Sequence, residues 1–110
     1  MIKWDDFERV ELRVGNIIEV LDFLEAKKPS YKLKIDFGDN IGIKKSSAQI
    51  TDLYIHEDLL GKQVIGVVNF PPKQIGPYIS ECLITGFVQN DGAVVLAVPD
   101  KQVKNGLKLA

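Results

Sequence analysis

The 110-residue sequence is poor in the residues that build covalent or metal cross-links, with one cysteine, Cys82, and one histidine, His56. A single cysteine excludes an intramolecular disulfide and a cysteine-based zinc site. No apolar run approaches the roughly 20 residues of a membrane helix, and the N-terminal MIKWDDFERVE lacks the apolar core of a signal peptide. We therefore expect a cytoplasmic protein that folds as a single domain over residues 1–110.

Groups that perform catalysis are equally scarce. The chain contains no Ser-His-Asp arrangement, no metal-ligand spacing and no glycine-rich phosphate loop. Cys82 lies in the apolar stretch CLITGF, which favours a packed thiol over a nucleophile. Two adjacent acidic pairs, Asp5-Asp6 and Glu57-Asp58, are explained more simply as helix caps than as acid–base partners. The sequence predicts a protein that is not an enzyme and that needs no cofactor or metal.

Charge is nearly balanced overall but unevenly distributed along the chain. The net charge of −1 argues against a strong general binder of nucleic acid. Residues 1–25 carry a local charge of −4, whereas residues 26–50 carry +4. This asymmetry predicts a polar surface with one cationic face.

Most of the chain has the pattern of β-strands separated by turns. Residues 31–37, YKLKIDF, alternate between apolar and polar side chains, which predicts a half-buried strand with lysines on its outer face. The turn GDN then leads into IGIKK at 41–45, which completes a hairpin. Further strands are expected at 10–23 with a kink or bulge at Gly15, at 62–70, at 79–88 and at 93–98, the last two joined by Asn90-Asp91-Gly92, and short helices at 4–10 and 56–62.

The stretch KKSSAQIT, residues 44–51, interrupts this strand pattern. Ser46 or Ser47 can cap a helix that runs on into AQITDLYIHEDLL, although a helix start leaves Lys44 and Lys45 without a role. Three strands, a helical insertion and two or three further strands, with a long kinked first strand, follow the order of an OB-fold. We expect an all-β, five-stranded OB-fold barrel with short helices at the N-terminus and after the third strand, and with C-terminal extension strands.

Ligands of OB-folds bind to the outer face of the second and third strands and to the adjoining loops. On that layout, four cationic side chains are expected to share one outward face. These are Arg13, Lys32, Lys34 and Lys44. The alternative for each of them is an ordinary solvated strand face.

Six segments of the chain resemble the tRNA-binding domain family, an OB-fold module that is appended to some aminoacyl-tRNA synthetases and is also found as free homodimers. They are ELRVGNIIEV (11–20), YKLKIDFG (31–38), IGIKKSSAQIT (41–51), GKQVIGVVNFPPKQIG (61–76), SECLITG (80–86) and VVLAVPDKQVKNGLKL (94–109). IKKSSAQIT and VVNFPPKQI are more specific, and they resemble the CsaA branch of small proteins regarded as export-related chaperones. The resemblance implies a homodimer that binds unfolded or precursor polypeptides, with the secretion machinery as a further candidate partner.

tRNA binding through the cationic face is the alternative that the same resemblance implies. Relatives that bind tRNA usually carry a serine, followed three positions later by a methionine and with a glycine between them, in the segment that matches SECLITG. Ser80 is retained here, but positions 82 and 83 are Cys and Leu. We therefore expect any affinity for tRNA to be weak and strongly dependent on salt.

The loop FPPKQIGPYI, residues 70–79, offers apolar side chains on a proline-stiffened segment. A chaperone needs exposed apolar surface beside adaptable polar groups. The expected polypeptide-binding residues are Phe70, Ile75, Tyr78 and Ile79. The alternative is ordinary loop packing or a contact between subunits, to which the C-terminal KNGLKLA is expected to contribute an interface strand.

Overall fold

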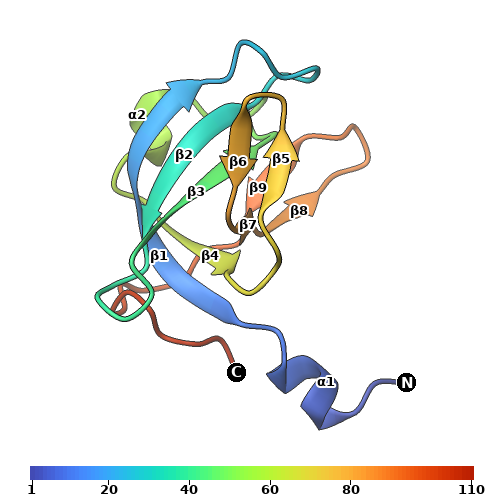
Figure 1. Cartoon of the computed structure of the whole chain (residues 1–110), viewed down its shortest axis with the longest axis vertical. Helices are drawn as coiled ribbons and strands as arrows, with labels where there is room; N and C mark the ends of the chain where they lie inside the picture. Colours follow the sequence, from blue (N-terminus) through green and yellow to red (C-terminus); the bar gives the residue numbers. More distant parts are fainter.

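A computed structural model describes all residues, 1–110, and shows a barrel of short strands with two small helices (Figure 1). The elements are α1 (Trp4–Glu8), β1 (Leu12–Asp22), β2 (Tyr31–Asp36), β3 (Ile43–Ala48), α2 (His56–Leu59), β4 (Gln63–Val67), β5 (Lys73–Ile75), β6 (Tyr78–Ser80), β7 (Leu83–Ile84), β8 (Gly86–Val88) and β9 (Val94–Leu96). Five strands form one antiparallel sheet in the order β3-β2-β1-β4-β7. The expected all-β OB-fold barrel is thereby confirmed. Neither helix is long and apolar enough to cross a membrane.

Strand β1 bends so that it can pair on both of its edges. Its first half pairs with β4 and its second half with β2, and the register with β2 shifts between Ile17 and Glu19. This bulge curves the sheet. The predicted irregularity in β1 is thus present, but the extra residue is Ile18 and not Gly15. Gly15 instead makes room in the core for the ring of Phe37.

Phe37 fills the interior of the barrel beside two glycines. Its side chain is fully buried, as are those of Leu33 and Ile35 on the predicted inward face of β2. A Cβ atom on Gly15 would lie 2.8 Å from Phe37 Cδ1, and one on Gly66 would lie 2.9 Å from Phe37 Cζ. Both strands need glycine at these positions because the aromatic ring occupies the space where a side chain would start.

The predicted helix start at Ser46 or Ser47 is wrong, because β3 continues through both serines to Ala48. The hydroxyl of Ser46 points into the barrel and donates to the carbonyl of Cys82 at 3.0 Å. The amide of Ser47 donates to Ser80 Oγ at 3.2 Å. These partners lie far away in the sequence, so local capping propensity gave the wrong answer. The short helix before Gly61 does form, as α2.

The predicted strand at 79–88 is divided into β6, β7 and β8. Only β7 belongs to the barrel sheet, whereas β5–β6 and β8–β9 are separate two-stranded hairpins. The β8–β9 hairpin turns at the predicted Asn90-Asp91-Gly92, where Gly92 has a φ of 90°. In Figure 1 the β5–β6 hairpin lies beside β3.

The C-terminal segment lies along β1 of its own chain. Amide N–H groups of Gly106 and Leu109 donate to the carbonyls of Val14 and Leu12 at 2.7 and 2.8 Å. Arg13 and Lys108 form an isolated antiparallel bridge. The predicted C-terminal interface strand is therefore already paired within the monomer.

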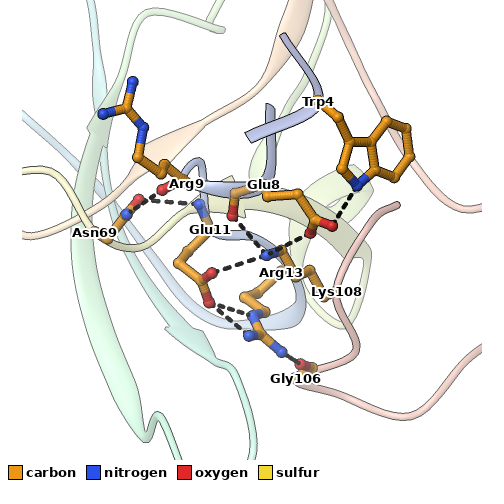
Figure 2. Close-up of polar contacts among 8 residues, drawn as sticks. All are labelled: Trp4, Glu8, Arg9, Glu11, Arg13, Asn69, Gly106 and Lys108. Carbon is orange, nitrogen blue, oxygen red and sulfur yellow. Dashed lines mark hydrogen bonds and ion pairs between the residues drawn. The ribbon is translucent and has the colours of Figure 1, made fainter. Parts of the chain in front are cut away.

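None of the five residues of helix α1 is buried. Polar contacts, rather than apolar packing, therefore hold this helix against the C-terminal segment (Figure 2). The Lys108 ammonium donates to the carbonyl of Glu8 at 2.8 Å and pairs with Glu11 Oε2 at 3.0 Å. Arg13 donates to Glu11 Oε1 and to the carbonyl of Gly106. We call Glu8, Glu11, Arg13 and Lys108 the terminal clamp.

Acid should open the terminal clamp. Hydrogen bonds from Arg13, and then from Lys108, lower the pKa of the Glu11 carboxyl from 4.5. A lowered folded-state pKa means that the stabilisation is present above pH 4.5 and is lost as the pH falls through the folded-state value. We expect the fluorescence of Trp4, the only tryptophan, to change in this acidic window. Glu11→Gln should remove that transition; an identical transition in both proteins would show that another group controls it.

Candidate ligand-binding surfaces

A cleft of about 1290 Å³ lies beside the β5–β6 hairpin. Apolar side chains from four segments line it, and Phe70 among them remains 54% exposed. The apolar lining includes Phe70, Ile75, Leu83, Ile84 and Val94. Polar lining comes from the end of β3 and from β6, and Lys27, Lys28 and Lys73 face the cleft together with one acid, Glu25. This combination suits an apolar chain segment that also carries polar or acidic groups.

One backbone hydrogen bond and several side-chain hydrogen bonds, rather than a regular ladder, attach the β5–β6 hairpin to the edge of β3. The amide of Glu81 donates to the carbonyl of Lys45 at 2.7 Å, and the amide of Lys45 donates to Glu81 Oε1 at 2.9 Å. Ser80 Oγ accepts from Ser47 and donates to the carbonyl of Cys82 at 3.3 Å. The hairpin is thus fixed firmly at the base of β6.

Three lysines form a cationic face on the outside of β2 and β3. Lys32 and Lys34 of β2 lie opposite Ser47 and Lys45 of β3. Directly opposed like charges on adjacent strands repel each other. Lys34 is drawn instead towards Glu19, at 3.5 Å, and Lys32 lies 3.9 Å from Glu25. We call Lys32, Lys34 and Lys45 the cationic face, and these two acids partly offset its charge.

Tyr78 of β6 reaches over this cationic face. Its hydroxyl donates to the carbonyl of Leu33 in β2 at 3.2 Å, and its ring packs edge-on against Phe23 with centroids 5.6 Å apart. The ammonium groups of Lys32 and Lys45 lie 5.4 and 5.2 Å from the centroid of the ring, within the range of cation–π attraction. Burial, followed by the negative charges of Glu19 and Glu81, raises the pKa of Tyr78 to about 12. The phenol therefore stays protonated, and its O–H group continues to donate to the carbonyl of Leu33.

The structure separates the residues that were predicted to share the cationic face. Lys32 and Lys34 do lie on one face, but Lys44 pairs with the core residue Ile35 and so takes a position on the inward side of β3. Arg13 lies two residues from Gly15, also on the inward side, and belongs to the terminal clamp. The sequence did not indicate Lys45 as part of this face, because the exposed Ile43 and the inward Ser46 reverse the usual apolar pattern of β3.

The residues predicted to bind polypeptide are likewise divided. Phe70 and Ile75 line the cleft, whereas Tyr78 lies over the cationic face and Ile79 does not line the cleft. Ser80, predicted to contact RNA, is buried beside the cleft, and its hydroxyl is occupied by Ser47 and Cys82. The roles of these residues stay predictions.

A family model described as "Putative tRNA binding domain" matches residues 12–108. The chain belongs to the tRNA-binding domain family. Its structure resembles that of the CsaA chaperone protein from Picrophilus torridus, with a TM-score of 0.93 and 55% identity, and both chains are covered completely. Chaperone CsaA from Bacillus anthracis str. Ames superposes with a TM-score of 0.94 at 44% identity, over 100% of this chain and 99% of that one.

The same tRNA-binding domain occurs within much longer enzymes. The chain is 38% identical over 109 residues to the methionine–tRNA ligase of Pyrococcus abyssi, and it spans 14% of that protein's length. The family model that matches this chain describes a tRNA-binding domain, and the two similar structures are those of chaperones; none of the three is a catalytic domain.

Cys82 occupies a packed position in this tRNA-binding domain. The thiol is buried and donates weakly to the carbonyl of Lys45 at 3.7 Å. Burial raises the pKa of Cys82 to about 12, so the thiolate form is disfavoured. The geometry supports the prediction that this residue is not a nucleophile.

Proposed function

We propose that the protein is a chaperone that binds unfolded or precursor polypeptides in the cleft beside the β5–β6 hairpin, in the cytoplasm and before export. The observation that carries this proposal is the exposed Phe70 at a cleft whose lining is largely apolar. Contiguous exposed apolar surface with polar groups beside it commonly marks a ligand-binding groove or an interaction site. Similarity to two CsaA chaperones over the whole chain supports the same function.

The proposed chaperone is a homodimer, and its exposed termini supply a surface for the second copy. Trp4 is 68% exposed on a helix that buries nothing, and Leu107 and Leu109 are exposed on the adjacent C-terminal segment. Apolar surface of this kind is usually covered in an assembly.

We expect a solution mass of twice 12.3 kDa at micromolar concentration. Trp4→Glu should shift the mass towards that of the monomer, because it would place a charge in the interface. Deleting residues 103–110 is a poor test, because the deletion would also remove the pairing with β1. A wild-type protein that sediments as a monomer would contradict the dimer.

A second candidate function is tRNA binding through the cationic face. It is favoured by the family match and by Lys32, Lys34 and Lys45, which lie on one outward face. Phosphate contacts need positioned cations more than particular base-reading groups. Because Glu19 and Glu25 lie beside two of these lysines, we expect modest affinity.

Replacing Lys32, Lys34 and Lys45 by methionine should weaken tRNA binding. The slope of log affinity against log salt should decrease by about 0.7–0.9 for each phosphate that the variant no longer neutralises. Lys44→Met is the matched control, since Lys44 takes an inward position, and it should leave the slope unchanged. Filter binding over a range of salt concentrations measures both quantities. A slope that the triple substitution does not alter would remove the cationic face from the binding site.

A further inference from the structure

Tyr78 lies over the cationic face and is the cross-strand neighbour of a residue that lines the cleft. Across the β5–β6 hairpin it pairs directly with Ile75, which lines the cleft. Its ring and hydroxyl contact the outer surface of the barrel at Lys32, Lys45 and Leu33. One residue therefore connects a wall of the cleft to the lysines proposed to bind phosphate.

The hairpin has a fixed end and an end held more weakly. At its base, Ser80 and Glu81 bond directly to β3. Towards its tip, just after the turn at Gly76-Pro77, Tyr78 supplies the hydrogen bond and the aromatic contact to the barrel. Because the contacts of this single residue hold the tip, their loss should let the hairpin open locally more readily than the core does.

We propose, on the basis of the functions proposed above, that Tyr78 is a latch that makes binding of RNA and binding of polypeptide antagonistic. With the latch closed, the ammonium groups of Lys32 and Lys45 hold the Tyr78 ring against the barrel, and Ile75 keeps its place in the cleft. A phosphodiester that takes up these ammonium groups withdraws them from the ring, because a full negative charge attracts them more strongly than a π face does.

Two features of the cluster support this coupling. Glu25, the ion-pair partner of Lys32, itself lines the cleft, so a phosphate at Lys32 would also release an acidic group there. Each cation–π interaction at an exposed site corresponds to about a two- to fivefold change in an equilibrium constant. By linkage, the effect of RNA on polypeptide affinity equals the effect of polypeptide on RNA affinity.

Amide exchange of the ligand-free full-length protein tests the latch directly. Lys45→Met and Tyr78→Leu should each raise exchange at residues 73–80 about two- to fivefold. Lys34→Met is the matched control, because Lys34 lies on the same face but pairs with Glu19 and not with the ring. Unchanged exchange in Lys45→Met and Tyr78→Leu, or an equal rise in Lys34→Met, would overturn the latch.

Competition between two probes tests the coupling. Saturating bulk tRNA should weaken binding of fluorescein-labelled, reduced and carboxymethylated lactalbumin about fivefold in the wild type, and not in Tyr78→Leu. If both ligands bind and tRNA leaves the affinity for lactalbumin unchanged, the coupling is overturned, but the latch is not. A protein that binds no unfolded polypeptide would overturn the proposed chaperone function and the coupling together, while amide exchange would still decide the latch.

Discussion

Phe70→Ala combined with Ile75→Ala is expected to weaken binding of an unfolded polypeptide about ten- to a hundredfold. Full burial of a large apolar side chain contributes roughly 1.5–3 kcal/mol, so half-burial of two such side chains contributes about that amount in total. Both residues line the cleft, and Phe70 is already more than half exposed in the free protein. The titration of a labelled, permanently unfolded protein measures this weakening.

The control pair is Leu53→Ala with Ile55→Ala, whose side chains are exposed but do not line the cleft. These substitutions remove comparable apolar surface elsewhere on the molecule, so the affinity should change less than about twofold. Added salt should weaken binding by the wild type only through the lysines that face the cleft, since apolar burial is not screened by ions. Equal weakening in the two double variants would mean that clients bind exposed apolar groups without a defined site.

Phe37→Ala is expected to lower the free energy of unfolding by about 3–5 kcal/mol, towards the upper end of that range. The cost of removing a core side chain depends on how far the neighbours can collapse into the space. Here the ring lies against Gly15 and Gly66, which have no side chains to move into the cavity. Denaturant titration of the wild type and the variant measures the difference.

A double-mutant cycle with Gly66→Ala makes this prediction specific. In the wild type the new Cβ atom would lie 2.9 Å from Phe37 Cζ, so Gly66→Ala should cost about 1–3 kcal/mol. In the Phe37→Ala background the same methyl group enters a vacated space and should cost much less. Additive effects on the free energy of unfolding would contradict the packing of Phe37 against Gly66.

The alternation of YKLKIDF was sufficient to predict β2 and its inward face, because one buried side of a strand leaves a clear period of two. The same rule failed for β3, whose inward positions are Lys44, Ser46 and Ala48. The partners of these residues come from β2 and from the segment around Cys82, far away in the sequence. No local pattern carries that information.

For the candidate site, the sequence indicated the segments but not the sides on which their residues lie. The loop at 70–79 was predicted as one apolar surface, yet Tyr78, on β6 next to β3, lies over the cationic face, whereas its cross-strand partner Ile75, on β5, lines the cleft. A substitution at Tyr78 is therefore expected to affect the cationic face directly and the cleft through Ile75, so it does not separate polypeptide binding from RNA binding. Only the packing of β6 against β3 shows this.

Site-specific photo-crosslinking tests most directly whether unfolded chains bind in the cleft. A benzoylphenylalanine at position 70, in the cleft, should crosslink to reduced, carboxymethylated lactalbumin, and excess unlabelled client should compete. The same group at position 55, where Ile55 is 60% exposed outside the cleft, should crosslink at background level. Equal crosslinking from the two positions, or none from position 70, would contradict binding in the cleft.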